Sequence, residues 1–327
     1  METVSIIIVN WNSRGYLQQC LASIRQSAAA CVCEVIVVDN DSADGSVEMV
    51  VDEFPEVTLI RAGANLGFAR ANNLAMKRAC GSLLALVNSD ALVHAGCMET
   101  LTSYLTAHPE VALVGPRVTG GDGRLQRTCR RLPTLWNTSC RTLALDRLFT
   151  DSRVFGGYEM PHWDHESESA VEVLSGCFCV ARRSAVDEVG RLDEQFFFYG
   201  EYIDWCKRFA DAGWKLVFVP AATATHFGGG STASAPLRYS IEILRATLKY
   251  WRKHHGLLGQ LLCRGLLVAH HGIRLALRAA MRVVGWRQST GSDYKLHEDA
   301  VCLRWLFTGS ELPAARGKSL SPESHPQ

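Results

Sequence analysis

Residues 4–12 read VSIIIVNWN, a short β-branched run that ends in polar residues. Further along the chain, runs of this kind alternate with stretches whose apolar residues recur at helical spacing. This alternation is typical of βαβ units, in which helices connect parallel strands. We therefore predict an α/β fold with a doubly wound, mostly parallel sheet, with strands at 4–9, 35–38, 57–61, 83–87 and 111–114 and helices at 16–26, 47–53, 68–80 and 96–105.

Small polar side chains follow four of the predicted strands, where each strand ends. They are Asn10, Asp39, Asn65 and the triplet Asn88-Ser89-Asp90. Any one of them could be an ordinary loop residue. In open parallel sheets, however, ligands bind outside the carboxyl ends of the strands. The four positions together therefore predict a polar ligand site at this edge of the sheet.

Three of the candidate side chains suit particular ligand groups. Asp39 could accept hydrogen bonds from a base or a ribose. Asp90 could hold a divalent ion that bridges two phosphates, because phosphates and waters complete the coordination of such an ion, although it could equally cap a helix. His226 precedes the glycine-rich stretch 228–231, whose backbone can approach phosphate closely. We therefore predict a metal or diphosphate site at Asp90 and His226.

Two further carboxylates follow an aromatic run in the second half of the chain. Residues 116–168 lose the regular pattern and are interpreted as an inserted region, after which we expect a strand at 171–180, a helix at 203–212 and a strand at 215–219. The aromatic run 196–199 comes just before Glu201 and Asp204. Carboxylates beside an apolar wall can have a raised pKa and act as general bases. Both are catalytic candidates, and the alternative for each is helix-end capping.

The composition excludes several classes of protein. Of 327 residues, 47% are hydrophobic and 20% are charged, and the net charge is +1, as in ordinary globular proteins. Collagen-like, mucin-like and wholly disordered chains are excluded, and nothing indicates nucleic acid as a partner. The twelve cysteines form no Cys-x-x-Cys pair, so we expect buried thiols in a reducing cytosol. The apolar run near the N-terminus is too short for a signal peptide, which predicts a cytoplasmic protein.

Basic residues are concentrated near the C-terminus. Residues 1–236 carry 20 basic and 27 acidic side chains, whereas residues 237–288 carry ten basic side chains and only Glu242. Residues 257–284 predict one amphipathic helix that is too charged to span a membrane. It should lie on an anionic membrane or pack on the catalytic domain, and five basic positions on one face favour the membrane. These positions are Arg264, His271, Arg274, Arg278 and Arg282.

Taken in order, the motifs resemble those of the family 2 inverting glycosyltransferases, most closely the bacterial rhamnosyltransferase-like branch. The similarity extends from about Val4 to His255. It is carried by residues 4–12, the Asp39 segment, residues 65–73, 88–90, 129–134, 175–176, 196–206 and 212–214, and His226 with its glycines.

The resemblance implies a GT-A fold and transfer of a sugar from a nucleotide diphosphate to an acceptor hydroxyl with inversion. By motif, Asp39 would contact the base, Asn65 and Arg70 would line the donor pocket with Asn10 and Asn88, and Asp90 would be the last carboxylate of the DxD element. His226 would complete a Mg²⁺ or Mn²⁺ site. The acceptor would be a glycan or a polyprenyl-linked glycan, which would place the protein at the inner face of the plasma membrane.

The domain organisation implied by the resemblance has three parts. Residues 1–236 would form the GT-A domain, with a nucleotide-binding half at 1–115 and an acceptor and catalytic half at 116–236. Residues 237–288 would form the basic helical extension, and residues 289–327 a tail that is partly disordered.

One position departs from the family pattern. The family has a Glu-Asp or Glu-Glu pair after the aromatic run and uses the second carboxylate as the base, but this chain has Glu201-Tyr202. A neutral tyrosine is a poor base near pH 7. Either Glu201 or Asp204 replaces it, or the protein binds a nucleotide sugar or glycan without efficient catalysis. An NAD-dependent oxidoreductase is the remaining alternative, but residues 10–13 are not the Gly-x-Gly-x-x-Gly that it requires.

Overall fold

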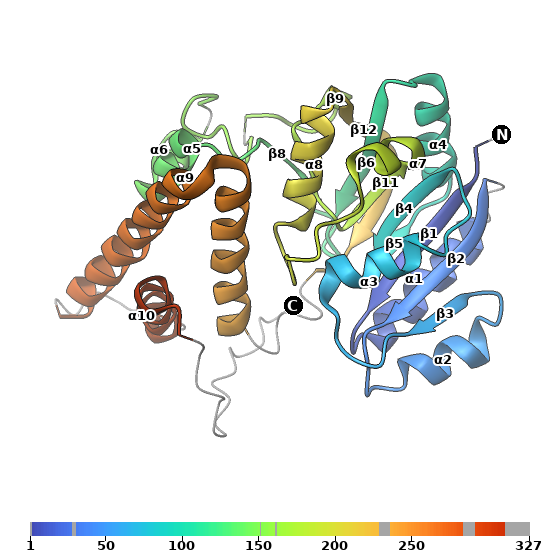
Figure 1. Ribbon diagram of the computed structural model, residues 1–327, viewed down its shortest axis with the longest axis horizontal. Helices are drawn as coiled ribbons and strands as arrows, with labels where there is room; N and C mark the ends of the chain where they lie inside the picture. The colour runs from blue at the N-terminus through green and yellow to red at the C-terminus, as the bar shows by residue number, and fades with distance from the viewer. Residues whose placement is uncertain are drawn as a thin grey trace. The chain divides into compact units, whose positions relative to one another are not determined.

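A mixed sheet lies at the centre of the first of two units in the computed structural model (Figure 1). The structure describes residues 2–27, 31–150, 152–160, 162–228, 236–283 and 292–310, without the side chains of Cys33 and Ser292. The first unit comprises residues 1–132 and 151–231, and the second comprises residues 133–150 and 232–327. The strand order along the sheet is β3-β2-β1-β4-β11-β6-β12-β5.

The first four strands of this order confirm the predicted parallel sheet. They are β3 (Thr58–Arg61), β2 (Val32–Asp39), β1 (Val4–Asn10) and β4 (Leu83–Asn88), and all are parallel. In β1, Ile6 and Ile8 join one hydrophobic core and Ile7 joins the other, so both faces of the strand are buried. This is the apolar pattern of a central parallel strand. Helices α1 (Arg14–Ser27), α2 (Ser46–Glu53) and α4 (Cys97–Ala107) contribute to the first core, and α3 (Gly67–Met76), α7 (Arg183–Val189) and α8 (Glu201–Asp211) to the second.

The other half of the sheet is mixed. β11 (Phe178–Arg182) is antiparallel to β4 and to β6 (Val111–Thr119), and β12 (Lys215–His226) is parallel to β6 and antiparallel to β5 (Ala91–Val93). The short strands β7 (Leu125–Gln126) and β9 (Ser169–Ala170) pair with β6 and β12. The expectation of one strand over 171–180 is wrong, because β10 (Val173–Leu174) leaves the main sheet and pairs with β8 (Cys129–Arg130).

The second unit is helical. It contains α5 (Leu135–Thr142), α6 (Leu145–Leu148), α9 (Pro236–Val283) and α10 (Ser292–Thr308), and α9 packs against both α5 and α10. Gly256 has φ +68° and divides α9 into two arms. The second arm matches the predicted helix as far as Val283, and Val284 lies outside the described residues. We did not predict α10, and residues 319–327, expected to be disordered, also lie outside the described residues.

The basic face of α9 packs against α10, which supplies carboxylates for it. The expected contact of this helix with a membrane stays a prediction. His271 Nδ1 lies 2.9 Å from Asp299 Oδ1, and Arg278 donates to Oδ2 of the same buried carboxylate. Arg282 pairs with Asp293 at 2.9 Å. None of the described helices is both long enough and apolar enough to cross a bilayer.

The cysteines are mostly buried, as predicted. Ten of the eleven whose side chains the structure describes are buried, and Cys80 is exposed. Desolvation by burial raises the pKa of thiols such as Cys20 and Cys206 to about 12, which keeps them neutral. They act as small apolar residues.

Candidate active site

The ends of β1 and β2 bring Asn10 and Asp39 together. The two residues are register partners in the parallel ladder, and Asn10 Nδ2 donates to Asp39 Oδ1 over 3.0 Å. The backbone N–H of Ser42 donates to Asp39 Oδ2 over 2.9 Å, so a turn after β2 fixes the carboxylate. Asp39 is 3% exposed. Each of its oxygens keeps a second lone pair that a ligand donor could use.

A chain of hydroxyl groups links this pair to the end of β4. Ser13 Oγ donates to Asn10 Oδ1 over 2.7 Å and lies 2.9 Å from Ser89 Oγ. Ser13 therefore holds the loop after β1 against the triplet Asn88-Ser89-Asp90. The sequence did not single out Ser13 or Ser42, because serine in a loop carries no distinctive pattern.

Asp90 and His226 lie side by side because β5 pairs with the end of β12. In this antiparallel ladder His226 is opposite Ala91, and the backbone N–H of Phe227 donates to the carbonyl of Asp90 over 3.0 Å. His226 Nε2 lies 3.1 Å from Asp90 Oδ1 and 3.2 Å from Asn88 Nδ2. Asn88 and His226, which are 138 positions apart in sequence, are thus brought to one edge of the sheet.

Gln126 fixes the orientation of the His226 ring. Its Nε2 donates to the carbonyl of His226 over 2.6 Å, which leaves its Oε1, 2.9 Å from Nδ1, to accept the ring N–H. In the neutral ring the lone pair is then on Nε2, which faces the carboxylate of Asp90. Two acceptor atoms 3.1 Å apart are stabilised by a cation between or beside them. Gln126 was not predicted, because it lies in the region where the sequence pattern is irregular.

These contacts fit a divalent cation. Within the described ranges, no cluster of three or more His, Cys, Asp and Glu residues could hold a metal. Two protein ligands suffice for an ion that also binds a diphosphate and waters, since Mg²⁺ commonly uses only one or two carboxylates from the protein. Asp90 and His226 could therefore hold such an ion only together with a ligand.

Asn65 and Arg70 lie at the start of α3. Asn65 is exposed, and its Oδ1 accepts the backbone N–H of Gly67 over 3.0 Å. Arg70 is exposed and pairs with Glu194 at 3.5 Å. A buried residue that was not predicted, Asn40, connects this segment to the end of β2 by donating to the carbonyl of Gly67 over 3.2 Å.

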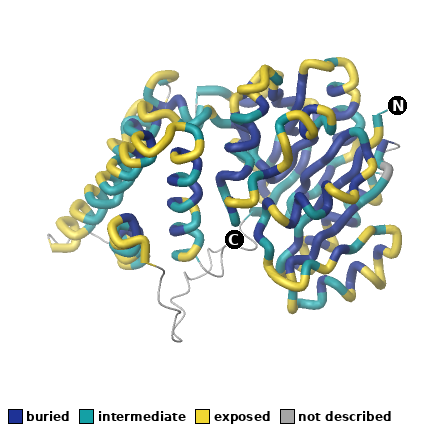
Figure 2. Tube along the Cα trace, viewed as in Figure 1, coloured by how far each residue is buried: buried dark blue, intermediate teal, exposed yellow. Residues whose placement is uncertain are grey.

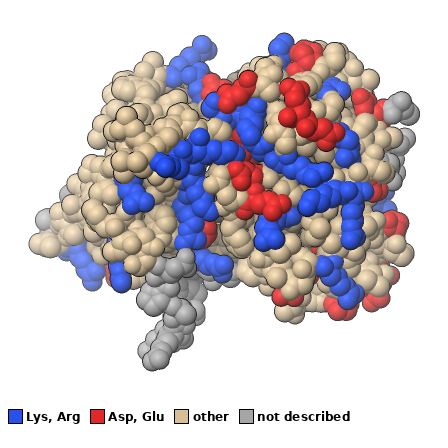
Figure 3. Space-filling view, in the orientation of Figure 1, with Lys and Arg blue, Asp and Glu red and all other residues tan. Residues whose placement is uncertain are grey.

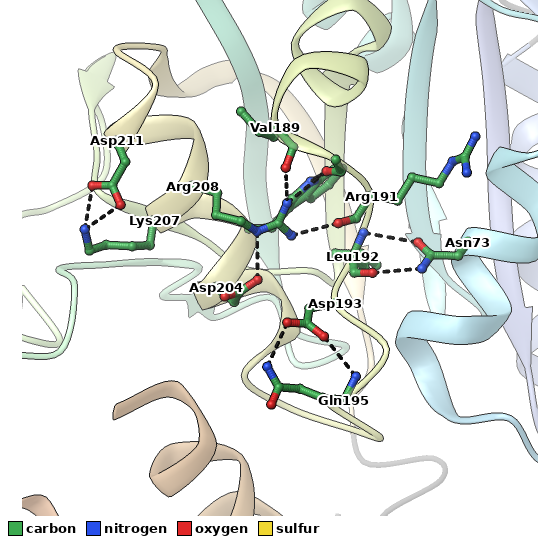
Figure 4. A network of polar contacts seen from close by, with 12 residues as sticks. Asn73, Val189, Arg191, Leu192, Asp193, Gln195, Asp204, Lys207, Arg208 and Asp211 are labelled. Atoms are coloured by element: carbon green, nitrogen blue, oxygen red, sulfur yellow. Dashed lines mark hydrogen bonds and ion pairs between the residues drawn. The ribbon is translucent and has the colours of Figure 1, made fainter. Parts of the chain in front are cut away.

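The aromatic run 196–199 packs directly on the start of α3. Gly67 has φ +78°, and a Cβ there would lie 2.3 Å from the carbonyl oxygen of Phe197. The N–H of Phe68 donates to that carbonyl over 2.8 Å. Asn73 holds the preceding loop, since its amide donates to the carbonyl of Leu192 over 2.8 Å and accepts the N–H of Leu192 over 3.1 Å (Figure 4). These contacts fix the position at which α8 begins.

Glu201 is the first residue of α8 and is 4% exposed. Its Oε2 is buried and has no hydrogen-bond partner among the described residues. Desolvation by burial raises the pKa of this carboxyl from 4.5 to about 7. A carboxylate in this state can exchange a proton near neutral pH.

Tyr202 is partly buried beside Gly176. A Cβ on Gly176 would lie 3.6 Å from Tyr202 Cβ, so the ring packs over this glycine. Desolvation raises the pKa of the phenol above its ordinary value of 10, and the positive charge of Arg130 opposes this only in part. The side chain therefore remains neutral at physiological pH.

Asp204 is held in a structural ion pair. It is fully buried, and its Oδ2 accepts from Arg208 Nε over 2.9 Å. The Arg208 guanidinium also donates to the carbonyls of Val189, over 2.6 Å, and Arg191, over 2.8 Å (Figure 4). Arg208 thus connects α8 to the end of α7 and to the loop after it, and its pair with Asp204 lies within α8. Of the two predicted catalytic carboxylates, the structure leaves only Glu201 with an unpaired oxygen among the described residues.

Solved structures share the fold. A mannosyltransferase from Pyrobaculum calidifontis, in complex with GDP-Man and Mn²⁺, is 15% identical with TM-score 0.52, covering 95% of this chain and 88% of that protein. Glucosyl-3-phosphoglycerate synthase from Mycobacterium tuberculosis, bound to Mn²⁺ and UDP, is 15% identical with a TM-score of 0.51. The match covers 76% of this chain and 80% of the synthase. The predicted GT-A fold is confirmed, with helices following it at the C-terminal end.

Sequence comparison identifies relatives of known activity and the family, which the shared fold alone does not. The chain is 26% identical over 308 residues to N-acetylglucosaminyl-diphospho-decaprenol L-rhamnosyltransferase of Mycobacterium tuberculosis, covering 88% of this chain and 99% of the relative. It is 27% identical over 254 residues to the pre-mycofactocin glycosyltransferase of the same organism, covering 72% of this chain and 48% of the relative. The sequence profile of glycosyl transferase family 2 matches residues 5–190, more than half of the chain. The chain is thus a glycosyltransferase that takes its sugar from a nucleotide donor, and it belongs to glycosyl transferase family 2.

Proposed function

We propose that the protein transfers rhamnose or a similar sugar, with inversion, from a nucleotide diphosphate to a hydroxyl of a cell-envelope polysaccharide or lipid-linked glycan. The sugar and acceptor are suggested by the mycobacterial rhamnosyltransferase, whose name gives a diphospho-decaprenol acceptor. That relative matches this chain over almost its whole length. An acceptor of this kind would place the protein at the inner face of the plasma membrane.

The observation that carries the mechanism is the buried carboxyl of Glu201, whose Oε2 has no hydrogen-bond partner among the described residues. In its ionised form Glu201 accepts the proton of the acceptor hydroxyl, and the oxygen then attacks the anomeric carbon on the face opposite the leaving diphosphate. The new carbon–oxygen bond forms as the bond to the diphosphate breaks, which inverts the configuration. With a pKa of about 7, Glu201 is ionised enough to act near neutral pH and returns its proton to solvent afterwards.

In this mechanism the nucleotide-sugar donor binds at the carboxyl edge of the sheet, on the side of the sugar opposite Glu201. Asp39 and Asn10 would bind the nucleoside, and Asn65, Arg70 and Asn88 would line the donor pocket. Asp90 and His226 would hold Mg²⁺ or Mn²⁺ against the diphosphate. Such an ion, when bound, offsets the charge that develops on the leaving group.

Calorimetric titration with UDP, dTDP and GDP, each with and without Mn²⁺, tests this assignment without knowledge of the acceptor. We expect one nucleotide to bind, and to bind more tightly with Mn²⁺. Release of that nucleotide from its sugar conjugate when a polyprenyl-linked acceptor is added would then establish transfer. Absence of binding by all three nucleotides would contradict the donor site.

Tyr202 favours a second candidate function, a protein that binds nucleotide sugar or glycan with impaired catalysis. The family position of the base is occupied by a neutral phenol, as described above. The variant Tyr202→Asp separates the two functions. If Glu201 is the base, the turnover of the variant should be close to that of the wild type. If the protein is a binder only, the variant gains turnover while nucleotide affinity is unchanged.

A further inference from the structure

The outward face of the second arm of α9, residues 257–283, is apolar over its whole length. Its large exposed residues are between 42% and 87% exposed, and small residues such as Gly265, Ala269 and Ala276 lie between them. Arg282 is the one exposed charged residue of this arm. Figure 2 shows the contrast between the exposed second arm and the more buried first arm. The large exposed residues are Leu257, Leu258, Leu261, Leu262, Ile273, Leu277, Met281 and Val283.

The opposite face of the arm fixes this orientation. Asp299 of α10, with a side chain 3% exposed, accepts from both His271 and Arg278. Arg264 donates to the carbonyl of Leu306 over 3.3 Å. Rotating the arm to bury its leucines would leave the buried carboxylate of Asp299 without these partners, and removing the partner of a buried charge is strongly destabilising. The apolar face therefore stays outward within its own unit.

The size of the face indicates that something covers it. An α-helix of this length extends about 40 Å, and monomeric proteins rarely expose contiguous apolar patches larger than a few hundred Å². Figure 3 shows this part of the surface largely without Lys, Arg, Asp or Glu. A face this long and this uniform lacks the polar groups that usually set the register of a protein partner.

The charges around the face match a phospholipid surface. The arm itself has no acidic residue, and Arg252 and Lys253 are exposed just before it. Arg282, which also pairs with Asp293 of α10, is exposed near its end. Basic groups flanking an exposed apolar stripe suit the headgroup layer of an anionic membrane. Because no described helix can cross a bilayer, the arm would have to lie parallel to the surface.

We propose that residues 257–283 lie flat in the interfacial layer of an anionic phospholipid membrane, with the leucine face inserted among the acyl chains. The basic face holds α10 and stays out of the bilayer. The contact therefore depends mainly on apolar burial rather than on electrostatic attraction, and it survives high salt. It does not involve Glu201 or Asp90, so it is independent of the transfer reaction proposed above.

Sedimentation of the full chain with phosphatidylcholine vesicles, with and without phosphatidylglycerol and at low and high salt, tests the proposal. The double variant Leu258→Glu/Leu262→Glu should lower the partition coefficient by roughly a hundredfold, since two leucines leave the acyl region. Val51→Glu, which changes an exposed residue of α2, is the matched control and should bind like the wild type. Circular dichroism and nucleotide titration of each variant show whether the fold and the donor site persist.

Two outcomes would overturn the proposal. Vesicle binding that is lost in high salt but unaffected by the double variant would assign the contact to basic residues instead. Self-association without vesicles, abolished by the same substitutions, would assign the face to a second copy of the chain. The variant Leu262→Trp tests how deeply this face enters the bilayer. Its tryptophan fluorescence should shift to the blue when vesicles are added and should be quenched by lipids with brominated acyl chains.

Discussion

Glu201 and Asp204 lie three residues apart on α8 and are both buried, but their surroundings differ. Asp204 accepts from Arg208 over 2.9 Å, and Arg208 in turn satisfies backbone carbonyls of the loop after α7. Glu201 has an oxygen with no partner among the described residues. Both carboxylates are therefore buried, and what distinguishes them is the cationic partner. Asp204 has one and is structural, whereas Glu201 is the candidate base.

The difference has an energetic consequence. A buried carboxylate with a cationic partner supports the fold, whereas an unpaired one is a cost that persists where function requires it. The first two substitutions below each change one side of this contrast, and the other two test groups outside it.

The largest effect is expected from Arg208→Ala, which leaves Asp204 buried without its cation. We expect the free energy of unfolding to fall by about 3–5 kcal/mol. Urea denaturation of the variant and the wild type measures this loss of unfolding free energy. Lys207→Ala is the matched control, because Lys207 forms a neighbouring pair with Asp211, whose side chain is 55% exposed. That variant should lose less than about 1 kcal/mol, and equal losses in both variants would remove the distinction between the two carboxylates.

Glu201→Gln should abolish transfer and yet stabilise the protein above neutral pH. The folded-state pKa of about 7 is above the ordinary 4.5, so the stability contributed by protonated Glu201 is full below about pH 4.5 and is lost as pH rises through about 7. Glutamine cannot ionise. The variant should therefore be more stable than the wild type by on the order of 3 kcal/mol at pH 8 and similar to it at pH 4.

Denaturant unfolding at these two pH values checks the effect on stability. In the wild type, kcat/KM should rise with pH through about 7 as Glu201 ionises. Full activity of the glutamine variant would show that the base is elsewhere. A stability difference that does not change with pH would show that Glu201 is not the titrating group.

At the donor edge, Asp90→Ala should weaken nucleotide binding in the presence of Mn²⁺ by roughly tenfold to a hundredfold. It removes one of the two acceptor atoms that face each other 3.1 Å apart. Calorimetry with and without Mn²⁺ measures the change. Asp122→Ala is the control, since this carboxylate is 60% exposed on its side chain and pairs with Arg124. Unchanged affinity of the Asp90 variant in Mn²⁺ would exclude it as a metal ligand.

The donor edge was predictable from sequence because its pattern is local. Apolar runs ending in Asn10, Asp39 and Asn88 predicted both the strands and the edge at which their polar residues lie. His226 joined them through the pairing of β12 with β5, which its glycine-rich context only suggested. Gln126 and Ser13 were missed because their function arises from contacts between distant segments.

α8 and α9 show the limits of local pattern. The spacing of apolar and basic residues predicted the two faces of the second arm of α9, but the choice of the buried face depends on Asp299 of α10, a helix that we did not predict. Similarly, nothing near Asp204 in sequence shows that Arg208 also binds the loop at 189–191. A charged position can be read from sequence, whereas its partner is set by tertiary structure.

The smallest effect is expected from Tyr202→Phe, which removes only the phenolic hydroxyl beside Glu201. Desolvation keeps this phenol neutral, so it contributes no base at pH 7 to 8. The ring still packs over Gly176, and stability should change by less than about 0.5 kcal/mol. Initial-rate measurement with the nucleotide identified by calorimetry should give a kcat close to that of the wild type. A large loss of kcat with unchanged nucleotide affinity would instead make the phenol part of proton transfer, and Glu201 would then share the reaction with its neighbour.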